Sequence, residues 1–194
     1  MASPTKTQLR AEILQARRAL SAQLREAEAD ALIEHLPAFT DAGQTVCAYV
    51  PVGSEPGSVE LIDSLLRREV RVLLPVARHD AADRPAPLQW GEYRPGGLVS
   101  ARYGLQEPSE PWLPADAIAA ASVVLVPALA VDRAGVRLGR GAGFYDRSLP
   151  LAAPTARLVA VVRDDELVDV LPAELHDVRM THALTPNGGL IALG

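Results

Sequence analysis

The sequence predicts a single α/β domain with a central, mostly parallel β-sheet flanked by helices. After Gly43, short β-rich runs alternate with helical or loop segments, which is the rhythm of βαβ units. One of these runs, "ASVVLVP", is apolar throughout, as a strand covered on both faces requires. The chain has 194 residues, 48% of them hydrophobic, so it can bury one sizeable core. We therefore expect residues 1–194 to form one domain.

The N-terminal segment carries a helical pattern. Apolar residues recur at helical spacing from about Lys6 to Leu36, which predicts one kinked helix or a pair of helices. Ser21 is placed to cap the second helix of such a pair. Pro37 and Gly43 end the segment.

The strands are expected in order along the rest of the chain. The runs that predict them are "TVCAYV", "RVLLPV", "LQWGEY", "ASVVLVP", "RLVAVV", "HALTP" and "GGLIAL", the third as an edge strand and the last as a strand or tail. A helix capped by Ser58 should lie between the first two strands. The stretch from Arg94 to Pro114 is rich in Gly, Pro and charge, so we expect an ordered but irregular excursion. "ASVVLVP" should lead directly into a glycine loop and then a helix.

Composition excludes several classes of function. The chain has 19 basic and 24 acidic residues and a formal charge of -5, so no global field attracts it to nucleic acid or to an anionic membrane. Its one cysteine, Cys47, excludes an internal disulfide framework, and its four histidines share no zinc-ligand spacing. The chain shows no signal-peptide layout and no apolar run of about 18 residues. We expect a cytoplasmic protein that binds neither nucleic acid nor membrane.

The segment "RLGRGAGFYDR", Arg137–Arg147, combines bare backbone with positive charge. Its three glycines let N–H groups approach an anion closely, and its three arginines add charge, so a polyphosphate would satisfy both features. Phe144 and Tyr145 offer a face for stacking, and Asp146 an oxygen ligand for magnesium. The segment fits neither the Walker pattern nor the dinucleotide fingerprint. From these residues alone, a tight turn with solvated arginines remains the alternative.

The longer stretch "AGVRLGRGAGFYDRSL" closely resembles the signature of 5-formyltetrahydrofolate cyclo-ligases, Gly-x-Arg-Leu-Gly-x-Gly-x-Gly-Tyr-Tyr-Asp-Arg. "KTQLRAEILQARRAL", "AYVPVGSEPGSVELID", "YGLQEP" and "LPAELHDVRMTHALTP" follow the family's order, so the resemblance spans nearly the whole chain. It implies an ATP- and Mg²⁺-dependent enzyme that converts 5-formyltetrahydrofolate to 5,10-methenyltetrahydrofolate by phosphorylating the formyl oxygen and closing the ring. It also implies a fold similar to sugar-phosphate isomerases and CoA-transferases, with an N-terminal helical segment folded over the nucleotide site. We expect a monomer.

The resemblance also implies roles for individual residues. The implied ATP-binding residues are Lys6, Arg10, Arg137, Gly139, Arg140, Gly141, Ala142, Gly143, Phe144 and Tyr145. The implied catalytic residues are Arg137, Arg140 and Tyr145. The implied substrate-binding residues are Val52, Glu55, Phe144 and Tyr145, with Glu55 holding the pterin. The implied metal ligands are Asp146 and Asp177.

Four positions depart from the family pattern. Ala142 stands where glycine or lysine is usual, and Phe144 replaces a second tyrosine. Gly57 replaces a commonly acidic residue, and Ser58 a threonine. The Phe144 and Gly57 departures fit one alternative, a non-catalytic folate- or nucleotide-binding relative. A sugar-phosphate or CoA-ester enzyme on the same fold is a second alternative, because the fold alone does not determine the chemistry.

Overall fold

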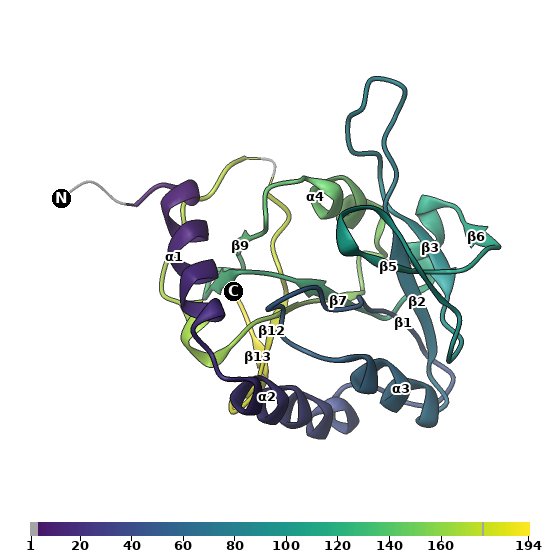
Figure 1. Cartoon of the computed structure of the whole chain (residues 1–194), viewed down its shortest axis with the longest axis horizontal. Coiled ribbons are helices and arrows are strands. Elements are labelled where there is room, and N and C mark those ends of the chain that lie inside the picture. Colours follow the sequence, from purple (N-terminus) through teal and green to yellow (C-terminus); the bar gives the residue numbers. More distant parts are fainter. Residues whose placement is uncertain (1–3, 176) are drawn as a thin grey trace.

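A computed structural model describes residues 4–175 and 177–194. The α-helices are α1 (Lys6–Arg18), α2 (Ala22–Glu34), α3 (Val59–Arg67) and the short α4 (Phe144–Ser148). The 3₁₀ helices are η1 (Leu36–Ala38), η2 (Arg102–Gly104), η3 (Ala115–Ala120), η4 (Leu149–Leu151) and η5 (Asp164–Glu166). Figure 1 shows α2 and α3 side by side below the sheet, with α1 standing apart from them. None of the helices in the described ranges is long and apolar enough to cross a membrane.

The N-terminal segment is a pair of helices, one of the two predicted arrangements. Thr5 caps α1 in a capping box with Gln8, since each residue accepts a hydrogen bond from the backbone N–H of the other. Ser21 caps α2 as predicted, and its hydroxyl accepts a hydrogen bond from the N–H of Leu24 at 3.1 Å. The non-helical Ser21 backbone separates the two helices, so α1 can pack against a different part of the molecule from α2.

The main sheet has the strand order β13-β12-β10-β7-β1-β2-β3-β6. Its strands are β1 (Thr45–Cys47), β2 (Arg71–Val76), β3 (Gln89–Glu92), β6 (Trp112–Leu113), β7 (Val123–Pro127), β10 (Arg157–Val161), β12 (His182–Thr185) and β13 (Gly189–Ala192). The run from β12 to β2 is parallel, and the outer pairings are antiparallel. The predicted mostly parallel sheet is therefore confirmed. The prediction of β3 as an edge strand is wrong, because β6 pairs with its outer side.

Both faces of the sheet are buried. Val46 and Val72 face the layer formed by α2 and α3, whereas their neighbours Cys47 and Leu73 face the opposite layer. Successive side chains of a strand point to opposite faces, so a strand covered on both sides must be apolar at every position. Burial raises the pKa of the Cys47 thiol to about 12, which suits an inert core residue.

Two small sheets complete the fold. They are β11 (Leu167–Val168), β8 (Ala130–Asp132) and β9 (Arg137–Leu138) in one, and β4 (Leu98–Ser100) with β5 (Gln106–Pro108) in the other. The β4–β5 hairpin lies inside the excursion from 94 to 114, which is thus more regular than expected. The prediction that "ASVVLVP" leads directly into the glycine loop is wrong, because β8 and β9 intervene. The buried carboxylate of Asp132 stabilises their turn by accepting a hydrogen bond from the N–H of Val136 at 2.8 Å.

Candidate functional site

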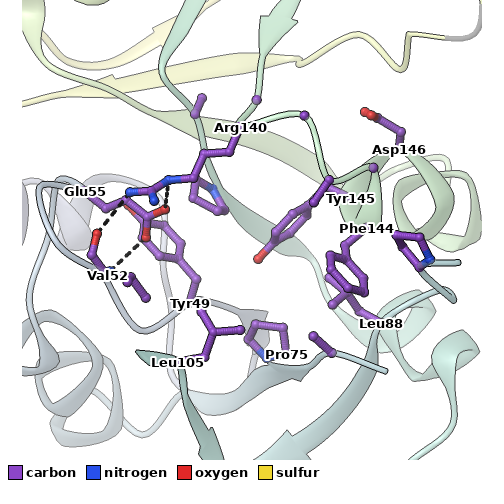
Figure 2. A pocket seen from close by; sticks show the side chains of 18 of the residues that line it. Tyr49, Val52, Glu55, Pro75, Leu88, Leu105, Arg140, Phe144, Tyr145 and Asp146 are labelled. Carbon is purple, nitrogen blue, oxygen red and sulfur yellow. Dashed lines mark hydrogen bonds and ion pairs between the residues drawn. The ribbon is translucent and has the colours of Figure 1, made fainter. Parts of the chain in front are cut away.

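A cavity of about 510 Å³ opens at the carboxyl ends of β1, β2 and β7. Pro127, at the end of β7, lines it together with Pro75 of β2 and Tyr49, which follows β1. The glycine loop and helix α1 also contribute to its wall, and Figure 2 shows many of the side chains that line it. Ligand sites of open α/β sheets form at this edge, where loops leave the strands.

The glycine loop, residues 139–143, joins β9 to α4. Gly141 and Gly143 have φ values of +99° and +82°, in the left-handed region that favours glycine. At Gly139 a Cβ atom would lie 2.6 Å from Nη1 of Arg137. The backbone therefore carries no side chain at these three glycines, and N–H groups there can approach a ligand closely.

Arg137 is buried beneath the loop, with 7% of its side chain exposed. Its Nη2 donates to Oδ1 of Asp146 at 2.8 Å, and its Nη1 donates to the carbonyl oxygen of Pro127 at 3.3 Å. The guanidinium carbon lies 5.8 Å from the ring centroid of Tyr145, a cation–π contact. These contacts fix the guanidinium in one place beside the cavity.

Helix α1 brings two further cations to the cavity. Nε of Arg10 donates to the carbonyl oxygen of Gly139 at 2.9 Å. Nζ of Lys6 lies 3.1 Å from Oδ2 of Asp177 and 3.2 Å from Oε1 of Glu174. Lys6 and Arg10 are one helical turn apart and therefore share a face.

A buried ion pair fixes the other end of α1. Nε and Nη2 of Arg17 each lie 2.7 Å from a carboxylate oxygen of Glu166, and Nη2 also donates to the carbonyl oxygen of Ala128 at 2.7 Å. The Arg17 side chain is fully buried. Removing one partner would leave the other charge buried and uncompensated, so this pair sets the position of α1 against the sheet.

Glu55 faces the glycine loop from the segment that follows β1. Its Oε2 accepts a hydrogen bond from the N–H of Val52 at 2.9 Å, and its Oε1 lies 3.0 Å from Nε of Arg140 (Figure 2). The hydroxyl of Tyr49 donates to the carbonyl oxygen of Pro56 at 2.6 Å and so holds the segment from below. Burial raises the pKa of Glu55, while the hydrogen bond from Val52 and the charge of Arg140 oppose the increase.

Aromatic and apolar side chains form the rest of the wall. Phe144 makes an edge-to-face contact with His79 at a centroid distance of 5.4 Å, and Pro75 and Leu88 lie beside it. The Tyr145 hydroxyl is buried without a hydrogen-bond partner among the described residues. Burial raises the pKa of Tyr145, and the charge of Glu55 adds to the increase. The hydroxyl is therefore protonated and able to donate.

Two aspartates also line the cavity. Asp146 is paired with Arg137, and Asp177 with Lys6. The described residues contain no group of three or more His, Cys, Asp or Glu side chains placed to hold a metal ion. Mg²⁺ commonly binds through one or two carboxylates together with substrate phosphates and water, so this pair fits a metal that arrives with a nucleotide.

The sequence matches a known family over nearly its whole length. The family model described as the 5-formyltetrahydrofolate cyclo-ligase family matches residues 2–186. The chain belongs to this enzyme family. A 5-formyltetrahydrofolate cyclo-ligase of Mycolicibacterium smegmatis is 63% identical over 193 residues, which cover 100% of both chains. One from Escherichia coli K12 is 32% identical over 145 residues, covering 74% of this chain and 78% of the relative.

Solved structures of similar proteins bear on the fold. The 5,10-methenyltetrahydrofolate synthetase of Aquifex aeolicus is 23% identical, with a TM-score of 0.78 over 96% of this chain and 92% of that one. The synthetase of Mycoplasma pneumoniae is 21% identical, with a TM-score of 0.69 over 90% and 94%. These likenesses show that the chain has the fold of those proteins. The likeness to sugar-phosphate isomerases and CoA-transferases stays a prediction.

All residues to which the family resemblance assigns a role lie around the one cavity. Those from distant parts of the sequence are Lys6, Arg10, Val52, Glu55 and Asp177, and the remainder come from the segment 137–146. Their individual roles remain predictions. Gly57 has a φ of +102°, a backbone conformation that an acidic side chain rarely adopts, so the departure at this position suits the local turn.

The sequence reasoning missed several residues of the wall. Tyr49, His79, Tyr103 and Glu107 line the cavity as well. Tyr49 could have been found, because it follows a parallel strand just before the Glu55 segment. The sequence around Glu107 does not indicate a place in the cavity. Glu107 belongs to β5, and its buried carboxylate accepts a hydrogen bond from the N–H of Ala77, which follows β2.

Proposed function

We propose that this chain is an ATP-dependent 5-formyltetrahydrofolate cyclo-ligase. In the reaction 5-formyltetrahydrofolate and ATP yield 5,10-methenyltetrahydrofolate, ADP and phosphate. The observation that carries the proposal is that one cavity of a chain from this family has two walls of different chemistry. A cation-flanked glycine loop forms one side, and a buried carboxylate beside aromatic side chains forms the other.

The triphosphate of ATP is proposed to bind at the glycine loop. Backbone N–H groups there can approach phosphate oxygens, because glycines leave the backbone bare. Arg10 reaches the loop from α1, Lys6 of the same helix lines the cavity, and Arg137 and Arg140 belong to the segment of the loop itself. Positioning and charge neutralisation supply most of the catalysis in phosphoryl transfer, and these residues provide both.

The pterin is proposed to bind at Glu55. A carboxylate can accept paired hydrogen bonds from the amino-pyrimidine edge of the heterocycle. Val52 lies beside it, and the rings of Phe144 and Tyr145 offer flat apolar surface across the cavity. Substrate atoms between Glu55 and the glycine loop would thus lie close to the γ-phosphate.

The reaction is proposed to follow two steps. The formyl oxygen attacks the γ-phosphorus, and the bond from that phosphorus to the β,γ-bridging oxygen breaks as ADP leaves. The anilino nitrogen then attacks the activated formyl carbon, loses its proton to solvent, and the carbon–oxygen bond breaks as phosphate leaves. Arg137 and Arg140 neutralise the charge that develops on the transferred group, and the Tyr145 hydroxyl donates to an oxygen of the reacting centre.

Asp146 and Asp177 are proposed to hold Mg²⁺ with the phosphates. The ion would neutralise phosphate charge and orient the leaving group. Asp146 also positions Arg137 through its 2.8 Å contact, so its carboxylate serves the site in two ways.

The remaining expectations extend this proposal. We infer that residues 1–194 act as one catalytic domain and that the protein works as a cytoplasmic monomer on a small-molecule substrate. We expect it to bind neither nucleic acid nor membrane.

A second candidate is a relative that binds folate or nucleotide without catalysis. The observation that favours it is Phe144, whose ring packs on His79 in place of a tyrosine that would carry a hydroxyl. No feature of the site favours a sugar-phosphate or CoA-ester reaction.

One assay separates these candidates. The protein is mixed with 5-formyltetrahydrofolate, Mg²⁺ and ATP, and absorbance is followed in the band of the methenyl product. Growth of the band only when ATP is present supports the cyclo-ligase. Binding of folate and nucleotide without growth of the band would favour the non-catalytic relative.

A further inference from the structure

Arg140 connects the two sides of the cavity. It belongs to the glycine loop, yet its Nε lies 3.0 Å from Oε1 of Glu55 and its Nη2 donates to the carbonyl oxygen of Val52 at 3.2 Å. Figure 2 shows both contacts crossing from the loop to the Glu55 segment. The Arg140 side chain is 45% exposed, whereas that of Glu55 is 11% exposed. An exposed, long cation therefore covers a largely buried carboxylate.

These contacts occupy the groups that a heterocycle would need. Oε1 of Glu55 is engaged by Arg140, and Oε2 by the N–H of Val52. An amino-pyrimidine edge presents two parallel donors, which are best accepted by both oxygens of one carboxylate. The Val52 N–H belongs to the same turn and can stay in place. The Arg140 guanidinium must leave the Oε1 side before the edge can approach it.

The same guanidinium is attractive to phosphate. Arg140 stands between Gly139 and Gly141, in the loop that is proposed to hold the triphosphate. A triphosphate offers several charged oxygens in a geometry that suits the planar guanidinium fork. Glu55 offers one carboxylate charge, and the exposed side of the ion pair is screened by solvent. A bound nucleotide therefore competes well for Arg140.

The other arginines of the segment are not placed to do this. Arg137 is nearly buried and braced by Asp146 and Pro127. Nη1 of Arg147 donates to the carbonyl oxygen of Gly143, the residue that precedes its own short helix α4. Among the contacts of the described residues, Arg140 supplies the link from this segment to Glu55.

We propose that Arg140 moves between Glu55 and the nucleotide phosphates, so that nucleotide binding uncovers Glu55 and tightens the binding of the folate substrate. The inference deepens the proposed function and rests on it. Because coupling between two sites is reciprocal, folate must tighten nucleotide binding by the same factor. The enzyme then fills its folate site preferentially when the phosphoryl donor is already present.

The test is a binding cycle on the full chain. The Kd for 5-formyltetrahydrofolate is measured by calorimetry with and without a saturating non-hydrolysable ATP analogue and Mg²⁺. For the wild type we expect the analogue to tighten folate binding at least about fivefold, the lower end of typical coupling between sites. In Arg140→Ala we expect the Kd for folate without nucleotide to be as tight as that of the wild type with the analogue, and the analogue to change it less than about twofold.

A matched variant controls for loss of charge near the loop. Arg147→Ala removes an exposed arginine of the same segment that touches Gly143 and not Glu55. It should keep the wild-type coupling factor at saturating analogue, whatever its affinity for the nucleotide. The nucleotide-free measurement on Arg140→Ala needs no bound nucleotide, so it remains decisive even where that variant binds the analogue poorly.

The outcomes separate the inference from the function. A wild type that turns over but shows no coupling, or an Arg140→Ala variant that keeps the coupling or binds folate more weakly without nucleotide, would overturn the proposed role of Arg140 alone. A wild type that neither binds the folate nor forms product would overturn the proposed function itself.

Discussion

The two loops that face each other across the cavity offer a ligand different chemical groups. The glycine loop exposes bare backbone, and its charge comes from several side chains on α1 and on the loop itself. The Glu55 segment is a compact turn in which the N–H of Val52 donates to one largely buried carboxylate, and the hydroxyl of the buried Tyr49 donates to the carbonyl oxygen of the next residue, Pro56. Many weak contacts can hold a flexible polyphosphate. A planar heterocycle needs one rigid acceptor.

This difference predicts which single substitutions should weaken ligand binding most. Charge around the glycine loop is shared, so the loss of one cation leaves the others in place. Among the described residues of the Glu55 segment, Glu55 alone places a carboxylate on the cavity wall. Substitutions at Glu55 should therefore act more strongly, and on a different substrate, than substitutions of the loop cations.

The largest effect is expected for Glu55→Gln. The change should raise the Kd for 5-formyltetrahydrofolate by about a hundredfold, because charge-assisted hydrogen bonds contribute about 1.5–3 kcal/mol each. Calorimetry should show that the ATP analogue still binds. Glu60→Gln, on the exposed face of α3, is the matched control and should bind folate like the wild type. Wild-type folate affinity in Glu55→Gln would remove the carboxylate from the site.

Asp146→Asn is expected to come second. It removes a charge from the proposed metal site and the partner of Arg137, so the turnover number should fall at least about tenfold. Circular dichroism should show an intact fold, since Asp146 is 39% exposed. Asp116→Asn, on the exposed side of η3, serves as the control. Activity equal to the wild type across a Mg²⁺ titration would contradict the assigned role.

Lys6→Ala tests the shared charge of the loop directly. The KM for ATP should rise about threefold to tenfold while the KM for folate changes little, because one of several cations is lost. Arg18→Ala, an exposed change at the far end of the same helix, should alter neither constant. An unaltered KM for ATP in Lys6→Ala would place Lys6 outside the nucleotide site.

The smallest effect concerns stability and pH. Burial raises the pKa of Glu55 above its ordinary value of 4.5, so the folded protein holds this proton more tightly than the unfolded chain. Below pH 4.5 the carboxyl group is protonated in both the folded and the unfolded protein, and it does not lower the free energy of unfolding. As the pH rises through the raised pKa, ionisation of the group in the folded protein lowers that free energy. Denaturant titrations should therefore show the wild type losing stability relative to Glu55→Gln as the pH rises through that window. A difference that is independent of pH would speak against the shift.

Local signals predicted much of this architecture. Ser21 and Ser58 cap helices because a side-chain oxygen next to the first turn is a local device. The apolar runs predicted the central strands, because a strand that is buried on both faces of a sheet is apolar along nearly its whole length. The glycine loop could be predicted because three glycines and three arginines lie within the one short segment Arg137–Arg147.

Long-range pairings could not be predicted. The pairing of β6 with β3 depends on a partner that the local sequence does not name, whereas the β8–β9 hairpin is a local pairing that the sequence prediction missed. The contact between Arg140 and Glu55 joins residues that are 85 positions apart in the sequence. The family resemblance placed both residues in one site, whereas only the geometry shows that they touch.

The central claim is that the glycine loop holds the triphosphate. A crystal structure with a non-hydrolysable ATP analogue and Mg²⁺ tests it most directly. We predict that the phosphates lie against the backbone of residues 139–143, with Lys6 and Arg10 beside them and Arg140 turned from Glu55 to a phosphate oxygen. Phosphates bound elsewhere, with the loop empty, would contradict the account.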